Sequence, residues 1–408
     1  MNLKLKLVFS SLLYSSLIIS TSNSQPIQTV DNKLNLADLG NKIENSISFN
    51  TSNSNYEKIC AITGQSVIVS ASSLIINGKT LEPEAINTRG QSSLFFRRKS
   101  YSFSLKSEAA FKHGDRTESF KKFYVISLSM DKNYCRNRLA FEMMGASDFF
   151  DLFYSFCELR INGQSEGICM VIERPDDWAL KKKCSPFLIR RGYNQTIKKI
   201  KTGRYTEPGD GKKYTACFRQ IYRSLNKYKG EELYNELSSR LDIGVYMKWI
   251  AFNFFVRNGD YTDEVNFYID PAIKKFNIIP WDYDDLFSAG PHEESIQNRK
   301  LREDKLFFST EDLLDRQIVV DPYLYKTYLI QFQELMNQLS PDVIKRIFEN
   351  TYAELYPYYS NNEIISNSQY DLYKDASLIK LKNDLSTLYE KLLIYRDVYL
   401  KDIAKNVK

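Results

Sequence analysis

The segment from Ile243 to Asp284 reads IGVYMKWIAFNFFVRNGDYTDEVNFYIDPAIKKFNIIPWDYD. Its apolar start, about Ile243 to Arg257, predicts a helix that Asp242 can cap. This helix delivers the chain to Asn258-Gly259-Asp260, a polar loop that carries one carboxylate. An Asn-Gly-Asp sequence after a helix is often only a cap and a turn, so its meaning depends on the residues after it.

Two short apolar runs come after the loop, at 266–269 and 276–279, and predict paired strands around a turn at Asp270-Pro271. The second run ends in Pro280-Trp281-Asp282-Tyr283-Asp284. Carboxylates gathered in this way repel one another unless a cation neutralises them. An exposed acidic turn is the simpler alternative, but the two segments together favour a metal site.

Asp260, Asn266 and Asp282 follow one another as in the magnesium–phosphate site of kinase-like phosphotransferases. In that layout the first Asp orients the acceptor hydroxyl, and the Asn and the second Asp hold Mg²⁺. The order of the three residues therefore indicates phosphoryl transfer.

The chain before residue 176 favours strands, and the chain after it favours helices. The signals before it are β-runs at 66–69, 74–76, 99–105 and 123–128, a helix at about 135–144 ended by Gly145, and a hairpin of 156–161 with 168–172 closed by Asn162-Gly163. The signals after it are helical patterns at 214–227 and 231–241, a helix start at Ser340-Pro341, and a long final helix.

The final helix carries an apolar stripe. Its members are Leu378, Leu381, Leu385, Leu388, Leu392, Tyr395 and Tyr399. Such a stripe can form a coiled coil, but more often it packs on its own domain.

These patterns predict an α+β fold in two lobes. We expect a signal peptide at 1–24 and a loose segment rich in Asn, Ser and Thr at 25–58. A β-rich N-terminal lobe would span 59–175. A helical C-terminal lobe that carries the acidic site would span 176–408.

The first residues have the features of a secretory signal. Lys4 and Lys6 precede a mostly apolar run from Leu7 to Ile19, which is too short to span a bilayer. We therefore expect a secreted or cell-surface protein with no integral membrane segment after cleavage. The formal net charge of +6 is mild, and its basic runs are typical of solvated faces, so no nucleic-acid partner is expected.

The six cysteines and two histidines limit the chemistry. An even number of cysteines in an exported protein permits disulfides, with Cys157 and Cys169 as a candidate pair, but buried thiols are an equal alternative. Neither His113 nor His292 lies near a nucleophile elbow, and the sequence holds no H-E-x-x-H zinc motif. Carboxylate-and-metal chemistry is the main option left.

A phosphoryl-transfer site also needs groups that hold phosphates. In the turn Arg89-Gly90-Gln91-Ser92, Gly90 frees the backbone, and Arg89 and Ser92 are donors. Lys99 starts the next strand and is the candidate cation, with Arg98 or Lys106 as alternatives. Glu142 is the candidate partner of that lysine.

Several short motifs occur in a joint order. They are Arg89-Gly90-Gln91-Ser92, Arg98-Lys99-Ser100-Tyr101, Asp131-Lys132 with Arg136-Asn137, Ile161-Asn162-Gly163 with Glu173, Asn258-Gly259-Asp260 with Asn266, and Pro280-Trp281-Asp282-Tyr283-Asp284. In this order they resemble the CotH kinase family, the spore-coat-type group of atypical kinases, over roughly residues 65–290.

The resemblance implies a reduced two-lobed, atypical protein-kinase-like fold. It implies that the protein binds ATP with Mg²⁺ (or Mn²⁺) and phosphorylates protein Ser or Thr hydroxyls. By the same resemblance Asp260 is the catalytic residue, and Asn266 with Asp282 binds the metal. Asp284 is the alternative or additional ligand.

The resemblance also implies roles for residues before the helical part. Lys99 and the Arg89–Ser92 turn would bind the phosphates, and Glu173 would lie near the nucleotide.

Two departures from the family pattern add acidic residues near the site. Tyr261-Thr262-Asp263-Glu264 comes after the catalytic Asp where a basic residue is expected, and Asp285-Leu286-Phe287 precedes Gly290. A catalytically silent surface adhesion or coat-assembly protein of the same fold is therefore the alternative. A glycosidase with paired carboxylates is a third, less favoured hypothesis.

Overall fold

The computed structural model describes residues 33–38, 42–192, 196–262, 265–292, 295–368 and 375–407. Contacts divide the chain into Met1–Lys33 and Leu34–Lys408, and only the second unit is described below. The signal peptide expected at 1–24 lies outside the described residues.

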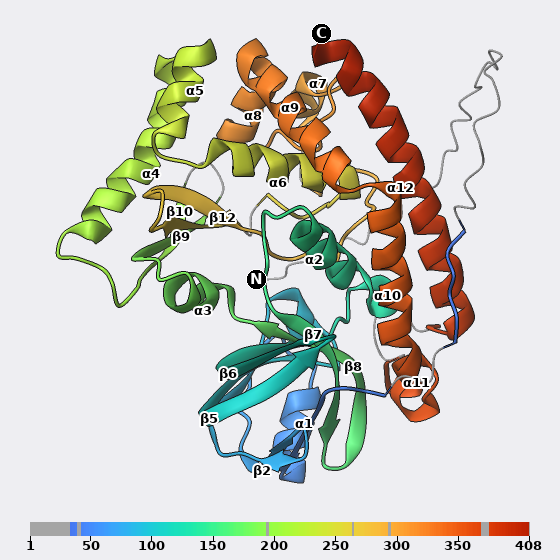
Figure 1. Ribbon diagram of the computed structural model, residues 1–408. Helices are drawn as coiled ribbons and strands as arrows, with labels where there is room; N and C mark the ends of the chain where they lie inside the picture. The colour runs from blue at the N-terminus through green and yellow to red at the C-terminus, as the bar shows by residue number, and fades with distance from the viewer. Residues whose placement is uncertain are drawn as a thin grey trace. The chain divides into compact units, whose positions relative to one another are not determined.

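Within the described residues, the strands form two sheets, which Figure 1 shows one above the other. The larger sheet has the spatial order β3-β2-β1-β7-β8-β6-β5-β4. Its strands are β1 (Ser46–Thr51), β2 (Ala71–Ile76), β3 (Lys79–Thr80), β4 (Pro83–Arg89), β5 (Ser100–His113), β6 (Arg116–Ile126), β7 (Tyr154–Ile161) and β8 (Gln164–Glu173). Strands β1 and β7 are parallel, and the other neighbouring pairs are antiparallel.

Strands β7 and β8 form the predicted hairpin, whose turn residues Asn162 and Gly163 have φ angles of 53° and 81°. This left-handed pair suits a two-residue hairpin turn. Alternate side chains of both strands face different cores, because successive residues of a strand point to opposite sides. Phe156 and Met170 join the core shared with the helices, whereas Cys157 and Cys169 join the core under the larger sheet.

The expectation of a loose segment at 25–58 is wrong from residue 46 onward. Residues 46–51 form β1, in the interior of the larger sheet between β2 and β7, with Ile47 and Phe49 fully buried. Helix α1 (Asn53–Cys60) comes next and is capped by Ser52. The alternation of buried residues that indicates this strand was overlooked because the composition of the segment is polar.

The smaller sheet has the order β10-β9-β11-β12. Its strands are β9 (Phe187–Arg191), β10 (Ile197–Thr202), β11 (Asn266–Asp270) and β12 (Lys275–Ile279). The pair β11–β12 confirms the two strands predicted around Asp270, whereas β9 and β10 were not predicted.

Helices make up most of the chain after residue 203. The described helices after α1 are α2 (Arg136–Ala146), α3 (Pro175–Asp177), α4 (Asp210–Lys227), α5 (Gly230–Ser238), α6 (Ile243–Val256), α7 (Ile296–Leu301), α8 (Leu313–Val320), α9 (Pro322–Gln338), α10 (Pro341–Tyr359), α11 (Asn362–Ser368) and α12 (Leu378–Val407), with short turns η1 (Ser92–Phe95), η2 (Lys132–Tyr134) and η3 (Trp178–Lys182). The mixture of sheets and helices confirms the α+β class. Helix α2 runs through Gly145 to Ala146, so the expected stop at Gly145 is wrong by one residue.

Helix α6 confirms the prediction from the apolar run. The side chain of Asp242 accepts a hydrogen bond from the Val245 N–H, and Arg257 ends the helix with a φ of 52°. Tyr246, Ile250 and the other inward residues are buried among surrounding elements. The buried helix α6 therefore fixes the position at which the loop at 258–260 starts.

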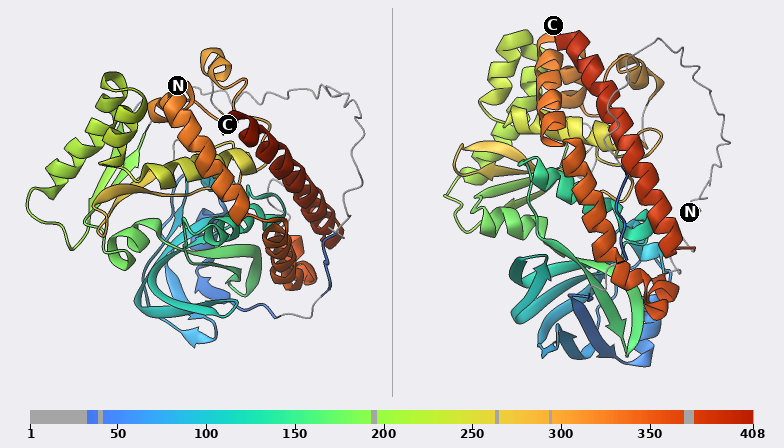
Figure 2. Two further views of the ribbon diagram at one scale, coloured as in Figure 1. Left: turned by 45° about the horizontal axis from the view of Figure 1, so that its top comes forward. Right: turned by 45° about the vertical axis from the view of Figure 1, so that its right-hand side comes forward.

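The stripe of α12 packs on its own domain. Leu381, Leu385 and Leu392 are fully buried, and α12 contacts α6, α9 and α10. The right-hand view of Figure 2 shows α10 and α12 side by side. These leucines are therefore covered by their own chain and do not form the seam of a coiled coil.

All six cysteines carry free thiols, so the disulfide alternative is not realised. Cys157 and Cys169 do face each other across β7 and β8. No helix in the described ranges is long and apolar enough to cross a membrane.

Candidate active site

A cleft of about 540 Å³ brings together residues from distant parts of the chain. The larger sheet supplies the turn after β4, and the C-terminal half supplies the loop at 260 and the acidic segment at 281–284. Of the predicted site residues, the cleft is lined by Arg89, Gly90, Ser92, Asp260, Asp282 and Asp284.

The turn after β4 depends on Gly90. Its φ is +106°, and a Cβ there would lie 1.9 Å from Ser93 Oγ, which instead donates a hydrogen bond of 3.1 Å to the Arg89 carbonyl. The guanidinium of Arg89 lies 3.9 Å above the centre of the Tyr124 ring. Only glycine allows this close and left-handed turn, which brings backbone and hydroxyl donors to the cleft.

Asn258 joins the two acidic segments. It is fully buried, its amide donates to Asn253 Oδ1 at 3.1 Å and to the Asp282 carbonyl at 3.3 Å, and its Oδ1 accepts from the Asp260 N–H at 3.1 Å. The loop that carries Asp260 is therefore fixed against the segment that carries Asp282.

His292 lies beside the Asp260 loop. Its Nδ1 is 3.8 Å from Asp260 Oδ1 and its Nε2 is 2.8 Å from Asp285 Oδ2. The Gly259 N–H donates to the Asp285 carbonyl at 3.0 Å, and the His292 N–H donates to the Gly259 carbonyl at 3.0 Å. Asp260 is about half exposed, so its carboxylate can reach a ligand in the cleft.

The acidic segment is strained and crowded with charge. Asp282 has a φ of +65°, a conformation that side chains rarely adopt and that is common at functional sites. Burial, followed by the charges of Asp282, Asp131, Asp285 and Asp260, raises the pKa of Asp284 well above its usual range. Such a carboxylate needs a cation in order to ionise.

The start of α2 holds this segment in place. Buried Asp131 accepts from the backbone N–H groups of Arg136 and Asn137 at 2.8 and 2.9 Å, and burial raises the pKa of Asp131 to about 6. Asn137 donates to Asp131 at 3.0 Å and accepts from the Tyr283 N–H at 3.1 Å, while Arg136 donates to the Asp284 carbonyl at 3.3 Å.

The donor set fits a magnesium ion that shares its shell with a phosphate. No group of three or more His, Cys, Asp or Glu side chains that could hold a metal by itself occurs in the described ranges. Mg²⁺ is usually bound by one or two carboxylates together with waters and substrate phosphates. Asp282 and Asp284, with their mutual repulsion, match that requirement.

Lys99 does not line the cleft. Its side chain is buried, and its amine donates to the carbonyls of Leu94, at 2.7 Å, and Phe96. Of the two alternatives, Arg98 donates to backbone carbonyls of β8 and Lys106 pairs with Glu82 at the surface. None of the three basic residues belongs to the cleft lining.

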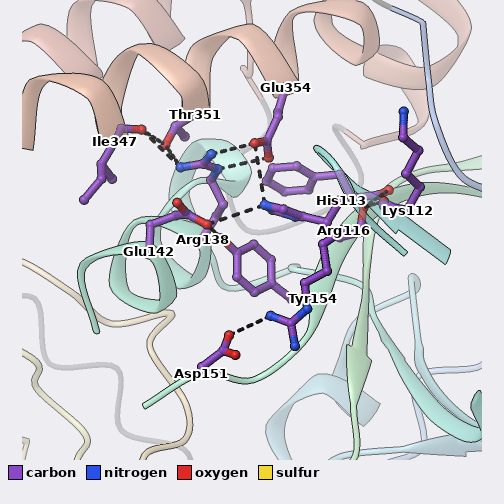
Figure 3. A network of polar contacts seen from close by, with 12 residues as sticks. Lys112, His113, Arg116, Arg138, Glu142, Asp151, Tyr154, Ile347, Thr351 and Glu354 are labelled. Atoms are coloured by element: carbon purple, nitrogen blue, oxygen red, sulfur yellow. Dashed lines mark hydrogen bonds and ion pairs between the residues drawn. The ribbon is translucent and has the colours of Figure 1, made fainter. Parts of the chain in front are cut away.

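Glu142 belongs to a separate polar network, shown in Figure 3. It accepts from the Tyr154 hydroxyl and lies 3.4 Å from His113 Nε2, and neighbouring Arg138 binds Glu354 of α10. These partners lower the pKa of Glu142 to about 2, against the opposing effect of its burial. Glu142 therefore cannot serve as the partner of Lys99 in this structure.

Glu173 and Asn266 also lie outside the cleft lining. Glu173 is buried at the end of β8, near the Phe153 N–H at 3.4 Å and the Lys182 amine at 3.6 Å, and burial raises its pKa. Asn266 starts β11, directly opposite Arg190 of β9.

Several lining residues were not predicted from the sequence. They are Ser100, Ile126, Ser127, Leu128, Ser129, Met130, Asn137, Phe141, Met170, Ile172, Arg190 and Trp281, whereas Gln91 lies inside the predicted Arg89–Ser92 turn and Ser93 adjoins it. The apolar members come from β6 and the loop after it, α2, β8 and the segment before Asp282, and they suit a flat heterocycle. Asn137 and Trp281 stood inside recognised motifs, whereas Arg190 lies on a strand that was not predicted.

A buried network of hydrogen bonds and ion pairs holds the Asp260 loop. Arg191 is fully buried, lies 3.2 Å from Asp312 Oδ1, and donates to the Tyr246 hydroxyl at 3.0 Å and the Thr262 carbonyl at 3.3 Å. Tyr246 donates to Asp315 at 2.5 Å. The loop is therefore fixed to α6 and α8.

A family model and a curated relative match this chain. A family model described as CotH kinase protein matches residues 86–381, which is more than half of the chain. Inner spore coat protein H of Bacillus subtilis (strain 168) is 21% identical over 236 residues, which cover 54% of this chain and 63% of that protein. The chain thus spans less than two thirds of that relative's length.

Proposed function

We propose a function for this chain, which belongs to the CotH kinase protein family. It transfers the γ-phosphoryl group of ATP to Ser or Thr hydroxyls of a protein. The observation that carries this proposal is the cleft in which Asp260, Asp282 and Asp284 meet the Arg89–Ser92 turn. A two-lobed kinase-like arrangement, divided near residue 175, is part of the proposal.

Asp260 acts as the catalytic carboxylate. It orients the acceptor hydroxyl and takes its proton as the new phosphate ester forms. Its backbone is held by Asn258, and its side chain is exposed enough to meet a protein hydroxyl. This combination of a rigid backbone and an accessible carboxylate suits a macromolecular acceptor.

Asp282 and Asp284 would hold Mg²⁺ or Mn²⁺, together with phosphate oxygens and water. When bound, the metal neutralises charge on the phosphoryl group as a Lewis acid. The backbone and hydroxyls of the Gly90–Ser93 turn would bind phosphate oxygens, and the apolar side chains of Ile126, Met170 and Trp281 would suit the adenine. Asn266, which starts β11 after the Asp260 loop, is the further candidate metal ligand, although it lies outside the cleft lining.

The site of action is a coat or cell surface. This rests on the name of the relative, an inner spore coat protein, and on the secretory signal expected at 1–24. The nearest competing function is a coat-assembly protein without catalysis, which is favoured by the position of Lys99 outside the cleft.

Transfer of radiolabelled γ-phosphate to the protein itself and to a basic protein substrate tests the proposal. We expect transfer that requires Mg²⁺ or Mn²⁺ and that is lost in both Asp260→Ala and Asp282→Ala. If no form transfers phosphate and ATP with Mg²⁺ does not raise the melting temperature, the non-catalytic coat-assembly role replaces the kinase.

A further inference from the structure

We propose that Arg190 is a catalytic residue that binds the transferred phosphoryl group, in place of Lys99. The inference rests on the proposed function and adds the cation that the reaction requires. Phosphoryl transfer depends mainly on positioning and on neutralising charge, so a site without a suitable cation would be incomplete.

Lys99 is unsuited to this role because its amine is hydrogen-bonded within the connection between β4 and β5. Its bonds to the Leu94 and Phe96 carbonyls hold the turn η1, and burial lowers its pKa. Among the described residues that line the cleft, the basic side chains are those of Arg89 and Arg190.

The two arginines enter the cleft from different elements. Arg89 ends β4, in the same turn as Gly90 and Ser92, and stacks on Tyr124. Arg190 comes from β9, in the sheet whose strand β11 directly follows the Asp260 loop. Arg89 therefore lies with the phosphate-binding turn, whereas Arg190 lies with the reacting carboxylates.

Strand β9 fixes the direction of Arg190. It is an interior strand, in which Arg190 pairs with Lys199 on one side and with Asn266 on the other. Directly opposed residues of antiparallel strands share a face, and successive residues alternate. Arg190 and Asn266 thus face the cleft side, and Arg191 faces the core.

Arg191 ties this strand to the catalytic loop. Its guanidinium donates to the Thr262 carbonyl at 3.3 Å, and its N–H donates to the Val265 carbonyl at 2.9 Å. The backbone of Arg190 is therefore held at a set position relative to Asp260, two residues before Thr262.

The chemistry suits a guanidinium. As the bond between the γ-phosphorus and ADP breaks, a bond to the acceptor oxygen forms, and the acceptor proton passes to Asp260. The phosphoryl oxygens stay negatively charged throughout, and a permanently charged arginine can bind two of them with parallel N–H groups. Arg190 thus stabilises the group in transit.

The test compares wild type with Arg190→Gln, Arg190→Lys and a control, Arg223→Gln, whose arginine is exposed on α4. Initial rates of γ-phosphate transfer are measured together with the rise in melting temperature caused by ATP or ADP with Mg²⁺. We expect Arg190→Gln to lower kcat/KM at least ~10²-fold and to weaken stabilisation by ATP but not by ADP. Arg190→Lys should lie between, because it keeps the charge without the planar fork.

Two results would overturn the role of Arg190 alone. One is an active wild type together with an Arg190→Gln variant whose kcat/KM is within about 3-fold of the wild-type value. The other is an equal loss of ATP and ADP binding together with a lower melting temperature without ligand, which would make Arg190 structural. A wild type with neither transfer nor stabilisation by ATP would overturn the proposed function, and this inference with it.

Discussion

At the scale of single residues, Gly259 controls the contact between Asp285 and His292. A Cβ at this position would lie 1.9 Å from Asp285 Oδ2 and 3.0 Å from Ser288 Oγ. The Asp285 carboxylate can rotate away, but only by leaving His292. We expect Gly259→Ala to lower the transfer rate about 10-fold or more, because catalysis is sensitive to small displacements of the Asp260 loop.

The same substitution should cost only about 1–2 kcal/mol of folding stability, since a flexible side chain gives way. Gly211→Ala is the matched control, because a Cβ there meets nothing within 4 Å. If both variants transfer phosphate at the rate of wild type, the Asp285–His292 contact has no catalytic role.

Asp315 makes the folding stability depend on pH. Burial raises its pKa to about 7, from an ordinary value of 3.8, and Tyr246 donates a hydrogen bond to it. The folded protein therefore holds this proton more tightly than the unfolded chain does. The stabilisation is complete below about pH 4 and is lost as the pH rises towards 7.

Asp315→Asn keeps an acceptor for Tyr246 but cannot ionise. We expect the urea midpoint of wild type to fall between about pH 4 and pH 7 and that of the variant to change less. Equal slopes in the two proteins would show that Asp315 titrates at its usual pKa in the fold.

At the scale of elements, α2 connects the acidic segment to α10. Its first turn binds the backbone at Tyr283 and Asp284, and one residue later Arg138 reaches α10 (Figure 3). Arg138 donates to both Glu354 oxygens, at 3.0 and 2.6 Å, to Thr351 Oγ1 at 2.7 Å and to the Ile347 carbonyl at 3.1 Å.

We expect Arg138→Met to cost about 1.5–3 kcal/mol, as for lost hydrogen bonds to a charged group, because Glu354 stays partly in water. Its transfer rate should fall, and more Mg²⁺ should be needed for half-maximal rate, because the acidic segment loses its support. Glu363→Gln, which weakens an exposed ion pair with Arg160, should change stability by less than about 1 kcal/mol. If Arg138→Met needs the same Mg²⁺ concentration as wild type for half-maximal rate, the contact between α2 and α10 does not affect the proposed metal site.

Asn137→Ala removes both the bond from the Tyr283 N–H and the bond that the Asn137 amide donates to Asp131, without touching α10. We expect a higher Mg²⁺ requirement with a melting temperature lowered by only a few degrees, which is about 1 kcal/mol. Asn137→Ser, which retains a hydroxyl acceptor, should recover part of the activity. A variant that loses stability but keeps the wild-type Mg²⁺ requirement would make Asn137 purely structural.

Elements were predictable where their signal was local. The Asn162-Gly163 turn and the Asp242 cap each specify a backbone conformation, and the structure has both. Strands β9 and β10 were missed because Lys and Arg residues interrupt their apolar pattern. Strand β1 had the readable alternation of Ile47 and Phe49, but its polar surroundings suggested a loose segment.

That Asp260 and Asp282 lie in one cleft was predictable, because both residues are on loops next to buried elements. The positions of Lys99 and Glu142 were not predictable, because which way they point depends on tertiary partners. Glu142 lies against His113 and Arg138, and Arg138 is placed by α10, more than 200 residues further along the chain. Sequence spacing carries no information about such a contact.

At the scale of the whole unit, two hydrophobic cores share the hairpin β7–β8. Alternate residues of these strands belong to the core under the larger sheet and to the core of the helices. The cleft is lined from both sides of this junction, by the β4 turn and by the acidic segment. Its shape therefore depends on how the helical core is packed.

Helix α12 tests that dependence, because its stripe closes the helical core. Leu385 is fully buried on the face that packs against neighbouring helices, whereas Ile394 on the same helix is 60% exposed. We expect Leu385→Ala to cost about 2–4 kcal/mol, from lost burial and a new cavity, and Ile394→Ala to change stability by about 0.5 kcal/mol or less. Urea denaturation of the two variants measures both values.

The urea midpoints should not depend on protein concentration, because the buried stripe is covered by α6, α9 and α10 of its own chain. A midpoint that rises with concentration would instead show that α12 pairs two chains. Since α12 packs against α10 and α10 holds Arg138, Leu385→Ala should also raise the Mg²⁺ requirement slightly. If folded Leu385→Ala needs the same Mg²⁺ concentration as wild type, α12 affects only stability. In that case α2 is the element that sets the geometry of the acidic segment.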